Sequence, residues 1–179
     1  MTTRSSFQYG KRLAIVGSIL TAMVMLPYVG LLLSAVGVFL LLKAMKTFSI
    51  YYQDNSIYQN FLTSAKYYAV VLTSLGVVLI IITTTSPLVV ANRELSTICT
   101  AMSIAAFMLS ILAAYNMRKT LNLFSQKTSA KTFAVAGNLL LAGSLAAVLP
   151  AGFLVVFVAW ALAVACFINI LPRNNVPLA

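Results

Sequence analysis

Long runs of uncharged apolar residues, separated by short polar or proline-containing breaks, make up most of this chain. A helix needs about 20 residues to cross a hydrocarbon core about 30 Å thick. The spacing of the breaks therefore predicts an all-α membrane protein with six transmembrane helices in three hairpins. The six predicted helices cover 11–26, 28–47, 61–85, 95–115, 131–149 and 151–171.

The breaks between these runs differ in character. Pro27 and Gly30 predict a tight, uncharged turn between the first two helices. Pro87 is expected to end the third helix, and Asn92 to cap the fourth. The chain, 1–179, is interpreted as a single transmembrane domain. Its predicted parts are a helical hairpin over 11–47, an interfacial loop over 48–60, helices three and four over 61–115, a basic cytoplasmic loop over 116–130 and a last helical hairpin over 131–171.

The first and last hairpins begin alike, with KRLAIVGSIL at 11–20 and KTFAVAGNLL at 131–140. The identical positions are Lys11/Lys131, Ala14/Ala134, Gly17/Gly137 and Leu20/Leu140. Both hairpins begin with an odd-numbered helix and share one orientation, so the likeness predicts a parallel repeat and not an inverted one. Ancestral duplication and convergence on one packing solution both explain it.

Composition supports the membrane assignment. Hydrophobic residues make up 61% of the chain and charged residues 8%, with a mean hydropathy of +1.00. Soluble domains are about half apolar and about one quarter charged, so a soluble domain is excluded. The net charge of +10 comes from 12 Lys and Arg against two acids. Because the cations lie at the ends of apolar runs, we expect contacts with anionic lipid head groups and no nucleic-acid binding.

The cations are distributed unequally across the predicted topology. Six crossings place both termini and the loops at 48–60 and 116–130 on one side of the membrane. That side carries every Lys and Arg except Arg93. The positive-inside rule then predicts a multi-pass plasma-membrane protein with both termini in the cytoplasm. The first apolar run has no small-residue cleavage site, so we expect it to remain as a signal anchor.

The residue types needed for catalysis or metal binding are sparse. The chain has no His, and its two carboxylates, Asp54 and Glu94, are predicted on opposite sides of the membrane. Cys99 and Cys166 lie inside apolar segments, where a thiol behaves as a small apolar side chain. We therefore predict a protein that is not an enzyme, with no catalytic residue, no cofactor-binding residue, no metal ligand and no cofactor.

Neutral polar side chains within the predicted helices remain as candidates for contact with a solute. They are Thr73, Ser74, Ser103, Ser110, Asn138 and Asn169. Asn138 is the strongest candidate for a substrate contact, and an interhelical hydrogen bond worth about 1 kcal/mol is the favoured alternative. Small residues four positions apart predict close helix packing. These small-residue faces are Ala14/Ser18/Ala22, Ala65/Ala69/Thr73, Ala106/Ser110/Ala114 and Ala134/Asn138/Ala142.

Three segments carry a family resemblance: KRLAIVGSILT with the following LPYVG, YYQDNSIYQNFL, and KTSAKTFAVAG with the later VVFVAWALAVACFI. With these segments the chain resembles the prokaryotic, mainly archaeal integral-membrane family known as domain of unknown function nine-nine-six. The segment from Asp54 to Asn60 and the change from basic to apolar residues at the start of the fifth predicted helix are the most distinctive parts. The resemblance implies the membrane architecture and a prokaryotic plasma membrane, and it supplies no catalytic residue.

Two functions are compatible with these features. The first is a non-catalytic accessory or structural subunit of a larger membrane complex, such as a respiratory oxidase or a related assembly, with other membrane-protein subunits as partners. The second is a small transporter or channel for a neutral or weakly polar solute. An enclosed polar pathway lined by Thr73, Ser103, Ser110 and Asn138 would favour the transporter, and a dry bundle with an apolar outer face would favour the subunit.

Overall fold

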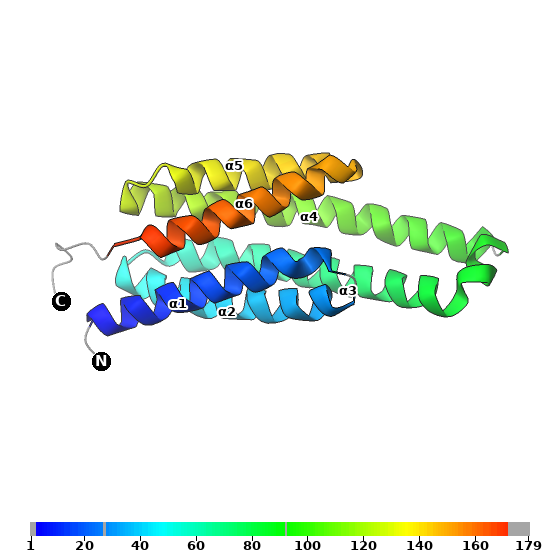
Figure 1. Cartoon of the computed structure of the whole chain (residues 1–179), viewed down its shortest axis with the longest axis horizontal. Coiled ribbons are helices and arrows are strands. Elements are labelled where there is room, and N and C mark those ends of the chain that lie inside the picture. Colours follow the sequence, from blue (N-terminus) through cyan, green and yellow to red (C-terminus); the bar gives the residue numbers. More distant parts are fainter. Residues whose placement is uncertain (1–2, 27, 92, 172–179) are drawn as a thin grey trace.

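The computed structural model describes residues 3–26, 28–91 and 93–171, and all regular structure within these ranges is helical (Figure 1). The α-helices are α1 (Thr3–Ala22), α2 (Val29–Tyr51), α3 (Asn55–Ala91), α4 (Arg93–Thr128), α5 (Thr132–Leu145) and α6 (Pro150–Asn169). Short 3₁₀ turns, η1 (Met23–Met25) and η2 (Ala146–Val148), follow α1 and α5. The prediction of an all-α protein is confirmed.

Four of the described helices, α2, α3, α4 and α6, are long and apolar enough to cross a membrane. The fifth helix with its 3₁₀ turn, Thr132–Val148, is apolar but shorter. Such helices are typical of a multi-pass membrane protein, in which helices satisfy their own backbone hydrogen bonds. These four helices do not by themselves give the number of membrane crossings. Helices α1 and α5 are not among the four, but each forms a hairpin with one of them, α2 or α6.

The helices form antiparallel pairs, with α3 and α4 lying between the α1–α2 and α5–α6 hairpins (Figure 1). The first and last helices also pack against each other and close the bundle. Helix α1 begins and α6 ends at the same end, where the α2–α3 and α4–α5 turns lie. At the other end α3 and α4 extend well beyond the turns of the shorter hairpins. We call the end with the α2–α3 and α4–α5 turns the basic end, and the opposite end, where α3 and α4 continue, the extended end.

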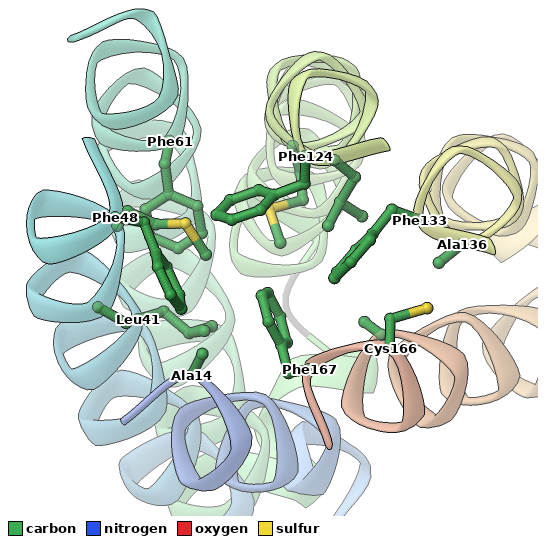
Figure 2. Packing of buried hydrophobic residues seen from close by; sticks show 14 of the residues in the cluster. Ala14, Leu41, Phe48, Phe61, Phe124, Phe133, Ala136, Cys166 and Phe167 are labelled. Atoms are coloured by element: carbon green, nitrogen blue, oxygen red, sulfur yellow. The ribbon is translucent and has the colours of Figure 1, made fainter. Parts of the chain in front are cut away.

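A cluster of phenylalanine rings fills the core at the basic end (Figure 2). Five rings are fully buried: Phe7, Phe48, Phe124, Phe133 and Phe167. The ring centroid of Phe124 lies 5.2 Å from that of Phe48 and 5.5 Å from that of Phe133. Their contacts are edge-to-face or tilted, as aromatic pairs prefer. Because the rings come from α1, α2, α4, α5 and α6, they join all three hairpins.

Two connections are much shorter than the sequence pattern predicts. The interfacial loop expected over 48–60 is reduced to 52–54, and the basic loop expected over 116–130 to 129–131. Polar residues of these segments such as Gln59 and Gln126 are exposed on helices, whereas Ser49 and Thr120 are buried. Within them, Ile57 and Phe61 are buried four positions apart, and so are Thr120 and Phe124. This helical spacing of buried residues outweighs the polar composition.

The break around Pro87 also differs from its prediction. Helix α3 continues through position 87 to Ala91, four residues beyond the proline. A proline removes its own N–H donor, but transmembrane helices tolerate this because they adjust locally around it. The predicted cap at Asn92 and the predicted breaker Pro27 lie outside the described residues.

The turns of the two short hairpins share a leucine and a glycine joined by a backbone hydrogen bond, but the first turn has one more residue between them and includes Tyr28 with φ of 58°. In the first, Leu26 N–H donates to Met23 O at 3.0 Å and Gly30 N–H donates to Leu26 O at 2.9 Å. In the second, Leu149 N–H donates to Ala146 O at 2.8 Å, and Gly152 N–H to Leu149 O at 2.9 Å. A Cβ atom on Gly30 would collide with the Met23 carbonyl oxygen, and one on Gly152 with that of Ala146. Glycine is required at both turns.

The predicted small-residue faces divide into two groups. On α1 and α4 they are packed inside the bundle, with Ala14, Ser18 and Ala106 buried. On α3 and α5 the faces lie largely on the outside of the bundle, although Ala65 of α3 is buried. There, Ala69 and Thr73 of α3, and Asn138 and Ala142 of α5, are exposed on the outer surface. The buried residues of α5 include Ala136, Gly137 and Leu140 instead.

Candidate functional site

An apolar cavity of about 770 Å³ lies between the helices, toward the extended end. Every α-helix of the described chain contributes to its wall, and α3 and α4 contribute most of it. The wall includes Leu41, Phe61, Val78, Ile104, Phe107 and Trp160. Because the short hairpins stop below the ends of α3 and α4, the cavity is closed by the bundle on one side and open on the other.

Most hydroxyl groups on the cavity wall have protein partners. Ser64 Oγ donates to the Ala113 carbonyl oxygen across the α3–α4 interface at 2.7 Å. Thr21 Oγ1 donates to the Gly17 carbonyl oxygen at 2.8 Å. The hydroxyls of Ser34 and Tyr68 form a hydrogen bond at 3.0 Å that joins α2 to α3. The cavity is suited to apolar contacts, because a polar solute would have to compete for these hydroxyls.

The structure brings together only part of the predicted polar pathway. Ser103 and Ser110 lie on the cavity wall, but their hydroxyls donate to Cys99 O at 2.8 Å and Phe107 O at 2.7 Å in their own helix. Thr73 is exposed and donates to Ala69 O at 2.9 Å. Asn138 is exposed on the outer face of α5, away from the cavity. The four predicted side chains therefore do not line one path.

The other predicted polar candidates lie elsewhere. Ser74 is half-buried on α3 and is not part of the cavity wall. Asn169 is exposed at the end of α6, donates to Ala165 O at 2.9 Å, and lies beside a smaller pocket of about 250 Å³ at the basic end. Both cysteines are buried free thiols, with Cys99 on the large cavity and Cys166 on the small one. Their positions agree with their interpretation as packing residues.

Sequence patterns did not indicate the cavity residues Phe61, Tyr68 and Trp160. An aromatic residue in a helix of this composition is as compatible with lipid contact as with a cavity wall. The tyrosine pair at 67–68 is equally typical of the membrane interface. Which of the two tyrosines faces inward depends on where α2 packs.

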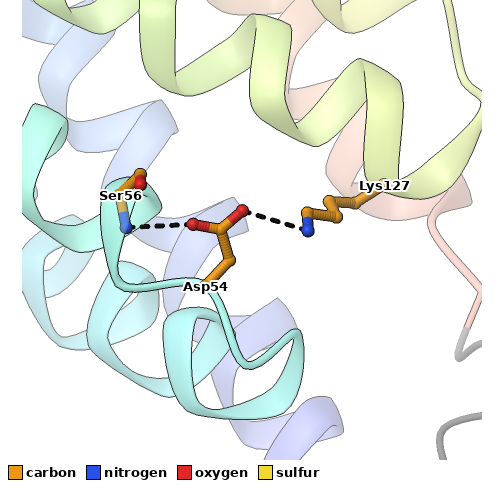
Figure 3. A network of polar contacts seen from close by, with 3 residues as sticks. All are labelled: Asp54, Ser56 and Lys127. Carbon is orange, nitrogen blue, oxygen red and sulfur yellow. Dashed lines mark hydrogen bonds and ion pairs between the residues drawn. The ribbon is translucent and has the colours of Figure 1, made fainter.

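Asp54 and Lys127 form an ion pair at the basic end, and neither lines the cavity (Figure 3). Lys127 Nζ of α4 lies 3.0 Å from Asp54 Oδ2 in the α2–α3 turn. Asp54 Oδ1 also accepts the Ser56 N–H at 3.0 Å, at the start of α3. Hydrogen bonding from Lys127 holds the pKa of the Asp54 carboxyl below its ordinary value of 3.8, although partial burial opposes this. The pair ties two hairpins together.

Other cations of the basic end contact neighbouring groups. Lys11 Nζ donates to the Ile170 carbonyl oxygen at 3.1 Å, which links α1 to the end of α6. Lys43 Nζ lies 4.7 Å from the Phe39 ring centroid, and Lys119 Nζ lies 4.5 Å from that of Tyr115. Among the described residues, no group of three or more Cys, Asp or Glu side chains could hold a metal ion.

Comparison with known proteins gives one match. The family model described as Protein of unknown function (DUF996) matches residues 33–161, from α2 into α6, which confirms the family resemblance. No curated protein and no solved structure matches the chain.

Proposed function

We infer that this chain, which belongs to the DUF996 family, is a non-catalytic membrane protein that serves as an accessory subunit of a larger membrane assembly. One observation carries the proposal. Two of the three residues of each small-residue face on α3 and α5 are exposed on the outer surface of the bundle, where they could pack against a helix. Small residues permit close approach between helices in lipid, where apolar surface alone supplies no driving force.

The face on α5 has the clearest chemistry for a partner helix. Ala134 is half-buried, and Asn138 and Ala142 are exposed four and eight positions later. An asparagine between two alanines can donate and accept hydrogen bonds across a close helix contact. We propose that a transmembrane helix of another subunit packs here and hydrogen-bonds to Asn138. A respiratory oxidase or a related complex is one assembly of this kind.

The transporter alternative receives less support. A coupled transporter usually has an intramembrane acid or base, and the cavity of this chain is walled by apolar side chains and by hydroxyls of which most are already hydrogen-bonded within the protein. Thr73 and Asn138 lie on outer surfaces and not on the cavity. A polar solute would therefore meet few groups able to replace its hydration.

Membrane orientation is part of the proposal. We propose that the basic end faces the cytoplasm of a prokaryotic plasma membrane, with both termini on that side and anionic head groups around its cations. The sidedness is the same whether each short hairpin crosses the whole bilayer, as the six-helix prediction has it, or only part of it.

Purification in mild detergent tests the subunit proposal. The native protein is expected to copurify with one or more membrane proteins in constant ratio. The double variant Asn138→Leu/Ala142→Leu should lose them, because it removes the polar group and the close approach. Val135→Leu, an exposed apolar change on the same helix, is the matched control and should retain them. Purification of the native protein alone, with solute flux in reconstituted vesicles that Asn138→Leu abolishes, would overturn the proposal.

The proposal also makes a spectroscopic prediction. The isolated chain is expected to show no absorption from haem or flavin and no stoichiometric metal, because it has no His and no cluster of thiols. Absorption spectra and elemental analysis after removal of all partner chains provide the measurement. A stoichiometric cofactor that stays with the chain would contradict a non-catalytic role.

A further inference from the structure

The positions of the charges along α3 and α4 indicate how these helices sit in a bilayer. Helix α4 has no charge over the 23 residues between Glu94 and Arg118, a length of about 34 Å. Helix α3 has none from Tyr67 to Ala91, about 37 Å. Both lengths match a hydrocarbon core of about 30 Å with its interfaces. The charges at the two ends of α4 therefore mark the two membrane surfaces.

Contacts between helices give the depth of the short hairpins relative to the uncharged span of α4. A Cβ atom on Gly137 of α5 would lie 3.2 Å from Arg118 Cα, so these two residues are at the same depth. From Gly137 the chain rises for 11 residues to Val148, about 18 Å, before it turns at Leu149. The α5–α6 turn therefore lies near the middle of the span marked by α4.

The α1–α2 hairpin stops at a similar depth. Ser34, five residues after the start of α2, hydrogen-bonds to Tyr68, only 13 residues into α3. Most of α3 from there to Ala91 lies beyond the α1–α2 turn, as Figure 1 shows. The 14 residues between this turn and Lys43 have no charge and measure about 21 Å, less than a hydrocarbon core of about 30 Å. Helix α2 reaches the length of a crossing only if the segment that carries Lys43 and Lys46 is included.

A bilayer positioned so that the short hairpins cross it completely would be much less favourable than one positioned between the charges of α4. With their turns at the far surface, a 30 Å core would enclose charged side chains of four helices, α1 to α4. These would be Lys11, Arg12, Lys43, Lys46, Lys66, Arg118 and Lys119. It would also leave exposed apolar side chains of α3 and α4 in water, including Ile80, Ile98 and Ile104. Both effects oppose this placement.

The turns themselves are compatible with an apolar environment. Neither turn contains a charged residue, and Leu26, Tyr28, Val148 and Leu149 are exposed there. The backbone hydrogen bonds from Gly30 and Gly152 satisfy carbonyl groups that a wider loop would leave open. A buried chain reversal in lipid must meet this condition.

We propose that α1–α2 and α5–α6 are re-entrant hairpins, which enter from the basic side and turn back within the bilayer, and that acyl chains of lipids from the opposite leaflet fill the cavity above them. In this arrangement only α3 and α4 cross the membrane. The cavity of about 770 Å³ lies between the charge levels of α4 and has an apolar wall, so hydrocarbon is the occupant that matches it. The inference does not depend on the proposed subunit role.

Spin-label depth measurements test the position of the turns. In the full chain with Cys99→Ala and Cys166→Ala, single cysteines would be introduced as Leu26→Cys or Leu149→Cys and labelled in proteoliposomes. Ser96→Cys and Lys119→Cys are controls for the two membrane surfaces. The two turn labels are expected to collide with oxygen and to be protected from a water-soluble nickel chelate, unlike both controls. Either turn label at the depth of the Ser96→Cys label would overturn the inference.

The single tryptophan tests the occupant without any substitution in the cavity. Trp160 is buried on the cavity wall. Vesicles of phosphatidylcholine brominated in the acyl chains are expected to quench its fluorescence as strongly as that of Phe157→Trp/Trp160→Phe, a half-exposed position on the outer face of the same helix. Aqueous acrylamide should leave Trp160 unquenched. Quenching by acrylamide, or bromine quenching of the outer position alone, would overturn lipid occupancy.

Discussion

At the scale of single residues, the Asp54–Lys127 pair links the α2–α3 turn to the end of α4. Removal of one partner by Asp54→Asn or Lys127→Met is expected to lower the free energy of unfolding by up to about 1 kcal/mol, the range for partly exposed ion pairs. The double variant should lose less than the sum of the two, as thermal unfolding in detergent would measure. Lys46→Met, which removes an exposed cation of α2, is the control and should have little effect. Additive losses would show that the pair does not interact.

The same pair predicts a pH dependence. The pKa of Asp54 is lower in the folded protein than its ordinary value of 3.8, so the folded state favours the charged form. This contribution to stability is fully present above the unfolded-state pKa and is lost as the pH falls through the lower folded-state pKa. Asp54→Asn should therefore destabilise the protein at neutral pH and have no effect below the folded-state pKa. An equal effect at both pH values would exclude charge as its cause.

The glycines of the short turns give a second residue-scale prediction. Gly30→Ala and Gly152→Ala each force a Cβ atom onto a backbone carbonyl oxygen and should destabilise the fold by about 1–3 kcal/mol. Gly76→Ala in α3 is the matched control, because its Cβ atom would have no neighbour within 4 Å. There the change should be neutral or stabilising by up to about 1 kcal/mol. Midpoints of thermal unfolding in detergent would compare the three variants, and equal midpoints would contradict the turn geometry.

At the scale of elements, the polar end of α4 shows how helical spacing outweighs composition. Residues 116–128 contain enough polar side chains to suggest a loop, yet Leu121 and Phe124 are fully buried. Phe124→Ala should therefore cost about 3–5 kcal/mol, as large-to-small changes in a packed core do. Gln126→Ala, an exposed change in the same turn of helix, should cost little. Similar unfolding midpoints for both variants would indicate that this segment is a loop.

At the scale of the whole molecule, the distribution of charge predicts orientation. A reporter protein fused after Ala179 is expected to be active only in the cytoplasm, and one inserted between Arg93 and Glu94 only outside it. A central Lys or Arg in a membrane helix costs about 2.5–3.5 kcal/mol, so the basic end as a whole resists transfer across the bilayer. Activity of the Ala179 fusion outside the cell would reverse this orientation. Cofactor content, copurification with other membrane proteins and the depth of the turns are likewise properties of the whole molecule.

Composition and local spacing alone were enough to predict the class of protein, the helical content and the charged end of the bundle. Long apolar runs form helices wherever water is absent, and the cations at their ends are visible without a structure. The predicted turn glycines, Gly30 and Gly152, are local features of the same kind.

Which helix faces are buried, and where each helix ends relative to its neighbours, depend on how the helices pack in three dimensions. Asn138 and Ser103 have similar apolar surroundings in the sequence, but one lies on the outer surface and the other on the cavity wall. The polar segments at 48–60 and 116–130 became helical because Phe48 and Phe124 pack against rings from other hairpins. Such contacts join residues far apart in the chain. No local sequence pattern specifies how far one hairpin extends along the bundle relative to another. The cavity exists because the short hairpins stop below the ends of α3 and α4, and that difference in height is a property of the assembled bundle.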